Sequence, residues 1–556
     1  MSSKRIYFNL FLIVLFGFLI RITCLDKPEG LWNDEYISWY ISSKPLFSEF
    51  IDEIYKNCHM PFYYIYIKFW SFLFGDTDLS LRISSVISGI LCIFASFYVG
   101  KELKDYKTGL LCAFLTSISG FMIYFSQEVR FYGLLTFFSF LTTIFFLKLL
   151  KNRSIINYIG FFISNVLVIL THTIGFVFVF FNLFFLFFYL KKEKQITYKP
   201  IIFMSIGILI SALPLTPFMF KTMTSSYISQ FWSDFSLTKL FFVLTDYISP
   251  IQINLINTPS GIRNLLFNSG KTSFGYWIFG IVPLFISAIS IFYAFSKKNI
   301  QIILLSSVAV STLFVTTVAS FLGKIVLITK YTCEIYPAFI LITAYGLTII
   351  KPEMIRKFLT SALLGLSLFY ILVSPYAPQK SDRKEGHKIV ADLIKAENFK
   401  SDDIIILLYY NANRFGKYID IENYNIDSVT KYNFQYKLLY RPDNHVEIIK
   451  NGKEIFLEDF RKGDTAILSE TLRTEIFKNI PSKGKFALIT LKSVSFIDEE
   501  KMKKLVEKPT AYKRMPLLFL VFSHISNVMK KEANKALIPV DYKTKGQWEI
   551  YVWKKR

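Results

Sequence analysis

Two adjacent carboxylates, Asp34 and Glu35, stand in the stretch GLWNDEYISW, close behind the first apolar segment of the chain. A carboxylate beside apolar surroundings can act as a general base, because partial desolvation raises its pKa toward a useful value. The same acids could instead begin an exposed helix, with Asn33 or Asp34 as its cap and negative charge favouring the positive helix end. This stretch alone leaves both interpretations open.

Further polar clusters interrupt or flank the apolar runs that follow. Ionisable residues at membrane depth are costly and usually face a cavity or a partner. The residues concerned are His59 in NCHMPFYY, Arg82 in SLRISS, Gln127, Glu128 and Arg130 in YFSQEVRFYG, His172 in THTIG, and Lys330 with Tyr331 in ITKYTC.

Each of these clusters also has a purely structural interpretation. Glu128 and Arg130 could form an ion pair within a loop, and Arg82 could pair with Asp78 one helical turn away. His172 could be a hydrogen-bonded residue at a helix break, which its position alone favours. Whether the clusters form one site depends on whether they lie on one side of a membrane.

The composition identifies a membrane protein. Of 556 residues, 53% are hydrophobic and 18% aromatic, more apolar surface than a soluble chain of this length could bury. The net charge of +23 comes from short basic clusters between apolar runs, so we predict no nucleic-acid partner. The five cysteines lack metal-ligand spacing; Cys24 and Cys58 could pair, but small buried hydrophobes are the favoured interpretation.

Apolar runs of about twenty residues match the hydrocarbon thickness of a bilayer. The first follows Lys4 and Arg5 without a small-residue cleavage site, so we expect an uncleaved first helix. Eleven spans are predicted at about 6–25, 79–100, 108–125, 130–148, 155–171, 173–190, 200–220, 274–295, 300–321, 325–349 and 355–374.

Lysine and arginine clusters set the orientation, because cytoplasmic loops retain them. With the N-terminus cytoplasmic, every cluster falls inside, while residues 26–78, residues 221–273 and the tail from Ala377 fall outside. The aromatic stretch Met60–Gly75 is short, begins near Pro61 and carries Lys68, so we expect a helix in the outer interface.

The tail has the patterns of a soluble α/β domain. HKIVADLIKAENF has helical spacing, whereas DDIIILLYY, DTAILSE and KFALITL have the apolar runs of strands. The predicted fold is therefore a polytopic α-helical membrane protein with about eleven transmembrane helices, interfacial helices in the first outer loop and a C-terminal soluble α/β domain. We place the domains at 1–376 and 377–556, the second on the outer side of the plasma membrane.

This topology gathers the polar clusters on the outer face, where a lipid headgroup would lie. Such a set suits transfer from a lipid phosphate: a carboxylate takes the proton of an acceptor hydroxyl, and arginine or lysine holds the phosphate leaving group. Aspartate or glutamate with histidine could alternatively bind a divalent metal.

The same residues carry a resemblance to a known family. The chain resembles polytopic GT-C glycosyltransferases of family 39-like type, which include protein O-mannosyltransferases and aminoarabinose transferases. The resemblance covers residues 5–190 well and 325–410 more loosely. It rests on NDEYISWYIS, HMPFYYIYIKFWSFLFGDTDLSLRISSVISG, IYFSQEVRFYGLLTFFSF, THTIGFVFVFFNLFFLF and TKYTCEIYPAFILITAYGL.

The resemblance implies an inverting transferase that moves a sugar from a polyprenyl monophosphate, undecaprenyl or dolichyl, to a lipid, glycan or protein acceptor outside the membrane. It implies Asp34 as the base with Glu35 beside it, and a donor and phosphate site of Gln127, Glu128, Arg130, Lys330 and Tyr331. His59, His172 and Arg82 would line the cavity. Some relatives use a metal there and others do not; the candidate ligands are Asp34, Glu35, His59 and His172.

Two departures from the family pattern concern single positions. Met60 precedes Pro61 where the family usually has two prolines, and Lys330 stands where an arginine is common. Lysine would bind phosphate as a point charge rather than as a fork.

Two other function classes compete with a transferase. A transporter or lipid flippase would fit the many spans, but such proteins often show internal repeats and Gly- or Pro-broken helix pairs near the midplane. We see neither in the sequence. A noncatalytic scaffold whose tail binds a partner is the third possibility.

Overall fold

The computed structural model describes residues 3–192, 199–224, 238–248, 272–322, 326–373, 387–399, 403–407, 417–418, 425–428, 436–440, 446–450, 453–455, 473, 476–491, 515–545 and 548–555. Contacts divide these residues into two units. The first contains residues 3–26 and 37–373, and the second contains residues 27–36 and those from 387 onward.

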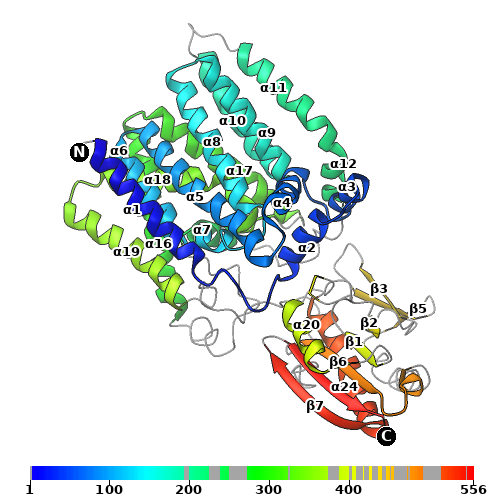
Figure 1. Cartoon of the computed structure of the whole chain (residues 1–556). Helices are drawn as coiled ribbons and strands as arrows, with labels where there is room; N and C mark the ends of the chain where they lie inside the picture. Colours follow the sequence, from blue (N-terminus) through cyan, green and yellow to red (C-terminus); the bar gives the residue numbers. More distant parts are fainter. Residues whose placement is uncertain are drawn as a thin grey trace. The chain divides into compact units, whose positions relative to one another are not determined.

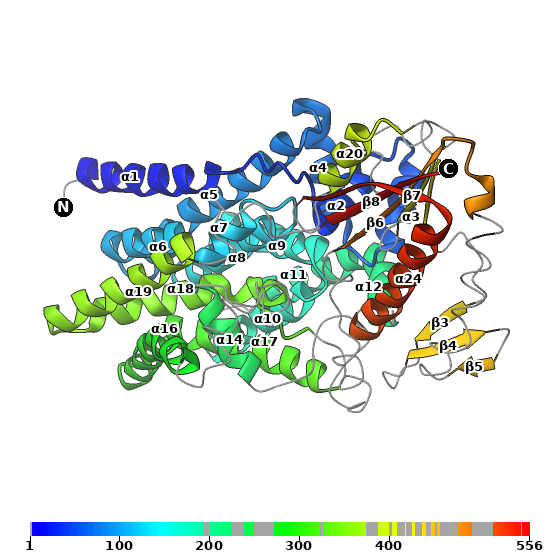
Figure 2. The ribbon, with the colours of Figure 1, turned by 90° about the horizontal axis from the view of Figure 1, so that it is seen from below.

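The first unit is helical, and its long helices run roughly along one direction (Figures 1 and 2). In chain order its elements are α1 (Ser3–Ile22), α2 (Asn33–Ser42, begun in the second unit), α3 (Phe47–Lys56), α4 (Pro61–Phe74), α5 (Asp78–Leu103), α6 (Tyr106–Ile118), α7 (Gly120–Phe125), α8 (Tyr132–Lys151), α9 (Ile155–Thr171), α10 (Gly175–Lys192), α11 (Lys199–Ala212), η1 (Leu213–Leu215), α12 (Thr216–Thr224), α14 (Thr238–Asp246), α16 (Thr272–Ser296), α17 (Ile300–Phe321), η4 (Thr329–Ile335), α18 (Tyr336–Ile349) and α19 (Glu353–Val373).

Helices occupy all eleven predicted spans, which confirms a polytopic helical membrane protein. Among the described residues, seven helices are long and apolar enough to cross a membrane, and α9 and part of α16 are shorter apolar helices. Three predicted spans are interrupted. Residues 108–125 break at Ser119, residues 200–220 pass through η1, and residues 325–349 become η4 followed by α18.

Close packing of α5 against α6 depends on two glycines. A Cβ on Gly109 would stand 2.6 Å from the Phe97 carbonyl oxygen, and one on Gly100 would stand 2.7 Å from the Thr108 carbonyl oxygen. Because both obstacles are backbone atoms, neither can rotate away. Small residues thus let the two backbones approach, as at many helix contacts in membranes.

The aromatic stretch predicted for the outer interface forms α4, whose Pro61 stands at the start of the helix. Its Lys68 Nζ donates to the carbonyl oxygens of Ser42 and Lys44, the first of them at the end of α2. The Ser42 carbonyl needs a donor because a helix leaves its last four carbonyls without internal partners. Phe72 is 84% exposed on the same helix. The lysine therefore fastens α4 to α2, and aromatic rings face outward.

The second unit contains two sheets and two main helices, α20 (His387–Ala396) and α24 (Met515–Ala536). One sheet has the strand order β2-β1-β6-β8-β7. Strand β1 (Ile404–Leu407) pairs in parallel with β2 (Asn425–Ser428) and β6 (Lys485–Leu491). Strand β8 (Trp548–Lys554) pairs antiparallel with β6 and with β7 (Ile538–Lys545). The other sheet is the antiparallel β3 (Tyr436–Tyr440), β4 (Val446–Lys450) and β5 (Lys453–Ile455).

Three of the four patterns named in the tail meet these elements. HKIVADLIKAENF forms α20, KFALITL forms β6, and part of DDIIILLYY forms β1. DTAILSE and the proposed boundary at residues 376 and 377 lie outside the described residues.

The segment before α2 packs within the second unit, although the sequence suggested the first. The Leu31 carbonyl accepts hydrogen bonds from the backbone N–H and the Nδ1 of His387. The Leu31 N–H donates to the Tyr418 hydroxyl at 2.7 Å. Gly30 has a φ of 74°, and a Cβ there would stand 2.5 Å from Lys388 Cβ. Glycine is thus required at this turn.

All five cysteines are free thiols, so the alternative of a bond between Cys24 and Cys58 is wrong. Cys92, Cys112 and Cys333 are the small buried residues that the sequence favoured. Cys24 is exposed and Cys58 is half-buried, which corrects that interpretation at both positions.

Candidate active site

The short turn between α7 and α8 is fixed by a fully buried arginine at the end of α1. Arg21 Nε donates to Ser126 Oγ at 3.0 Å, and its terminal nitrogens donate to the carbonyls of Ser117 at 3.0 Å and Thr116 at 3.1 Å. Gly89 of α5 makes room for this contact, because a Cβ there would overlap Ser126 Oγ. The turn is therefore set by three other helices.

Gln127 joins the same turn to the end of α1. Its Nε2 donates to the carbonyls of Arg21 and Thr23, both at 2.9 Å. These are among the carbonyls that a helix end leaves without internal partners. Both amide hydrogens of Gln127 are thereby engaged, so its amide nitrogen positions the turn and has no hydrogen left for a phosphate.

Glu128 and Arg82 are also buried beside this turn. Ser85 Oγ of α5 donates to the Glu128 carbonyl at 2.6 Å, and the Arg130 N–H donates to that same oxygen at 2.7 Å. Arg82 donates through a terminal nitrogen to the Leu25 carbonyl at 3.4 Å. Backbone contacts thus hold both ends of the segment that carries Arg130.

Four rings from four separate segments form a continuous aromatic stack. Phe131 lies 5.1 Å from His172, with nearly parallel planes, and 6.2 Å from His59, edge to face. His172 in turn lies 5.8 Å from Tyr331, again nearly parallel. The stack brings together the regions of YFSQEVRFYG, NCHMPFYY, THTIG and ITKYTC that the sequence could only predict to share one side.

Two cations lie near one ring of this region. The Arg130 guanidinium carbon is 5.8 Å from the centroid of the Tyr132 ring, and Lys330 Nζ is 5.9 Å from the same centroid. Arg130 also lies 5.2 Å from the Phe131 ring, and Lys330 lies 5.2 Å from the Tyr331 ring. Arginine and lysine over aromatic faces gain cation–π attraction. Two positive charges from distant segments thus lie within 6 Å of the centroid of one ring.

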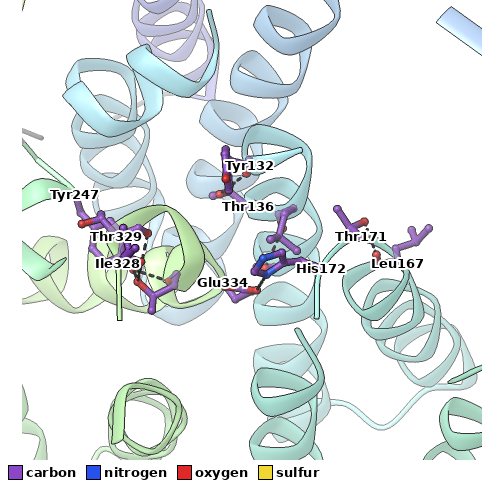
Figure 3. A network of polar contacts seen from close by, with 12 residues as sticks. Tyr132, Thr136, Leu167, Thr171, His172, Tyr247, Ile328, Thr329 and Glu334 are labelled. Atoms are coloured by element: carbon purple, nitrogen blue, oxygen red, sulfur yellow. Dashed lines mark hydrogen bonds and ion pairs between the residues drawn. The ribbon is translucent and has the colours of Figure 1, made fainter. Parts of the chain in front are cut away.

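His172 is bonded to an acid that the sequence reasoning missed. Its Nδ1 lies 3.0 Å from Oε1 of Glu334 in η4, and the two side chains point toward one another (Figure 3). Glu334 is fully buried, whereas the His172 side chain keeps 13% of its exposure. His172 is therefore hydrogen-bonded at the helix break, as the purely structural interpretation predicted. Its partner is a buried carboxyl group.

The segment η4 is held in place by a second polar group, from α14. Thr329 Oγ1 donates to Asp246 Oδ2 at 3.0 Å, and the Tyr247 hydroxyl, one residue beyond α14, donates to the Thr332 carbonyl at 2.5 Å. Figure 3 shows Tyr247 beside Thr329. Asp246, Tyr247 and Thr332 are all buried. These contacts fix the backbone that carries Lys330, Tyr331 and Glu334.

The adjacent acids Asp34 and Glu35 occupy the first turn of α2, in the part of that helix that belongs to the second unit. Glu35 is fully buried, and its Oε2 accepts the Trp32 N–H at 3.3 Å. This is a capping contact, which satisfies one of the free donors at a helix start. Asp34 is half-buried. Glu35 thus provides one capping contact at the start of α2.

The candidate metal ligands come from both units: Asp34 and Glu35 from the second, and His59 and His172 from the first. In the described parts of the chain, no group of three or more His, Cys, Asp or Glu side chains is arranged to hold one ion. Within the first unit, the Phe131 ring contacts His59 and His172 and stacks on the face of the latter.

Part of the chain matches a known protein family. Residues 58–219 match the family model described as dolichyl-phosphate-mannose-protein mannosyltransferase, and this range contains His59, Arg130 and His172. A search of curated proteins found no significant match.

The fold is similar to that of ArnT from Cupriavidus metallidurans. Its apo structure has a TM-score of 0.51 at 10% identity, with 99% of this chain and 98% of that chain covered. The undecaprenyl phosphate complex of the same protein gives 0.48, at 9% identity and the same coverage. AglB from Archaeoglobus fulgidus, an oligosaccharyltransferase with an inhibitory peptide and a dolichol-phosphate, gives 0.45 at 10% identity, covering 100% and 89%. The family model and the apo ArnT fold confirm the resemblance to GT-C glycosyltransferases.

Proposed function

We propose that this GT-C protein is an integral membrane glycosyltransferase that moves a sugar from a polyprenyl monophosphate to an acceptor on the outer face of the membrane. The supporting observation is the pair of cations, Arg130 and Lys330, near the Tyr132 ring. The match of residues 58–219 to a dolichyl-phosphate-mannose-dependent family supports a donor of this class.

The proposed reaction is a single displacement at the anomeric carbon. The acceptor hydroxyl oxygen forms a bond to that carbon while the bond to the phosphate oxygen breaks, and the phosphate leaves with the electron pair. Attack opposite the leaving group inverts the configuration. Arg130 and Lys330 stabilise the charge that the phosphate gains, as preorganised cations do best in a site shielded from water.

Asp34 is the proposed base that takes the proton of the acceptor hydroxyl. Of the two adjacent acids, Asp34 keeps partial exposure, whereas Glu35 is fully buried and bonded to the backbone of its own helix start. A base must reach the proton that it removes, so accessibility favours Asp34. Glu35 is assigned the role of shaping the first turn of α2.

Transfer from a radiolabelled polyprenyl phosphate sugar in membranes tests this proposal. Arg130→Ala and Lys330→Met should each lower kcat/KM by about 100- to 1000-fold, the size expected for losing a group that stabilises developing charge. Asp34→Asn should abolish most transfer. Lys357→Met is the matched control, because Lys357 is a highly exposed lysine on α19 and should leave the rate unchanged. Wild-type rates in all three site variants would refute the assignment.

The proposed orientation places the N-terminus inside and the second unit outside. Cys24 offers a native probe, because it is an exposed free thiol just beyond α1. A membrane-impermeant maleimide added to intact cells should label it, and Cys24→Ser should remove that labelling. Labelling that appears only after the membrane is opened would reverse the orientation.

A further inference from the structure

The pair formed by His172 and Glu334 stands apart from the proposed phosphate and base residues. Glu334 is fully buried in η4, and its Oε1 lies 3.0 Å from His172 Nδ1. Its second oxygen, Oε2, makes no hydrogen bond within the described residues. Burying a carboxylate with one hydrogen bond costs stability, so its presence needs a reason other than folding.

The contact fixes the hydrogen on one ring nitrogen. With Glu334 as a carboxylate, its Oε1 can only accept, so the hydrogen of this contact then stands on His172 Nδ1. Nearly parallel rings, Phe131 at 5.1 Å and Tyr331 at 5.8 Å, also limit the tilt of the imidazole. Both the tautomer and the orientation of His172 are thereby set by its neighbours.

The remaining nitrogen, Nε2, is the atom left to meet a ligand. No hydrogen bond from a described residue engages it, and the side chain keeps 13% of its exposure. A neutral ring offers a lone pair there, and a charged ring offers a hydrogen. A hydroxyl group satisfies both states because it donates and accepts, whereas a phosphate oxygen satisfies only the charged ring.

We propose that Glu334 is a positioning residue that holds His172 with its hydrogen on Nδ1, so that Nε2 binds a hydroxyl group of the sugar donor or of the acceptor. This rests on the proposed glycosyltransferase function and adds hydroxyl recognition to it. A carboxylate that orients a histidine in this way also strengthens the ring as an acceptor.

Paired substitutions separate this role from a structural one. Glutamine can place its amide near the position of Nε2, whereas asparagine reaches only that of Nδ1. His172→Gln should therefore keep more activity than His172→Asn, which should lose about 10- to 100-fold in kcat/KM, the size seen when an orienting contact is removed. Glu334→Gln should lose activity in the wild-type background and nothing further in His172→Asn. The substrate whose KM rises identifies the source of the hydroxyl.

Chemical modification of His172 tests this inference without measuring sugar transfer, so its result does not depend on the proposed glycosyltransferase activity. Diethyl pyrocarbonate acylates an unprotonated, accessible imidazole nitrogen, and mass spectrometry of the full-length protein in detergent can locate the product. His172 should be modified at neutral pH, and less readily in Glu334→Leu. This result would stand even if no sugar phosphate proved to be a donor.

Specific outcomes would overturn the inference. They are an unmodified His172 in the folded wild type, equal losses in His172→Gln and His172→Asn, or additive losses with Glu334→Gln. Glu334→Gln keeps a side-chain oxygen that can accept from His172 Nδ1 and should unfold as the wild type does, whereas Glu334→Leu leaves that hydrogen without its acceptor. A large fall in the unfolding temperature of Glu334→Gln would assign Glu334 a purely structural role.

Discussion

Replacing Arg21 by methionine should destabilise the helical unit without changing its apolar packing greatly. The guanidinium donates to the carbonyls of Thr116 and Ser117, in the last turn of α6. The usual helical donor for Thr116, the Gly120 N–H, is bonded to Ile248 instead. Removing Arg21 therefore leaves the buried Thr116 carbonyl without a donor, and the Ser117 carbonyl loses a charged donor.

The size of the effect follows from these two bonds. A hydrogen bond from a charged donor contributes about 1.5 to 3 kcal/mol, so losing two predicts about 3 to 6 kcal/mol. Ser126→Ala, which removes a single acceptor of the same arginine, should cost the loss of one such bond, about 1.5 to 3 kcal/mol.

Unfolding of the full-length protein by SDS in mixed micelles measures this difference. Arg5→Met is the matched control, because Arg5 is exposed on the same helix and should change stability by less than about 0.5 kcal/mol. Equal unfolding midpoints for Arg21→Met and Arg5→Met would refute the reasoning that the buried arginine supports the turn.

Two further predictions concern a helix contact and an ion pair. Gly109→Ala should lower the free energy of unfolding by about 1 to 3 kcal/mol, because the new Cβ meets the backbone of α5. Gly365→Ala has no atom within 4 Å of the new Cβ, so it should leave that free energy unchanged or raise it by up to about 1 kcal/mol. Unfolding in SDS measures both. Burial raises the pKa of Glu532, but hydrogen bonds from Lys535 and Arg473 outweigh it and leave that pKa below its ordinary value of 4.5. The ion pairs of Glu532 therefore stabilise the fold fully above its ordinary pKa, and less as the pH falls through the depressed pKa. Glu532→Gln should increase proteolysis of the second unit more at pH 7 than at pH 3. An equal increase at both values would contradict this.

Hydrophobic length predicted the helices well, because each span must cover the bilayer with its backbone hydrogen bonds satisfied internally. It could not predict the breaks. The apolar run 325–349 appeared continuous, yet the chain forms η4 and then restarts at Tyr336, with Pro337 in the first turn of α18. Proline near a helix start was the available signal, since it lacks the N–H that a continuing helix requires.

Buried polar residues were the main omission from the candidate site. Arg21 and Glu334 lie inside or beside apolar runs, and when each run is taken as one uniform span these two residues are not recognised as site residues. An isolated charge in such a run predicts a partner, but it does not say which one. The partners, α6 carbonyls for Arg21 and His172 for Glu334, come from segments about 95 to 160 residues away and depend on tertiary packing.

The dependence of the α7–α8 turn on α1 has a consequence for biosynthesis. Gln127 and Ser126 bond to the end of α1, which leaves the ribosome more than a hundred residues before them. The turn can reach its final form only if α1 stays in the membrane beside α5 and α6 while the later helices emerge. A protease that removed α1 would take with it the arginine that the turn requires, so retention of this segment is a condition for assembly.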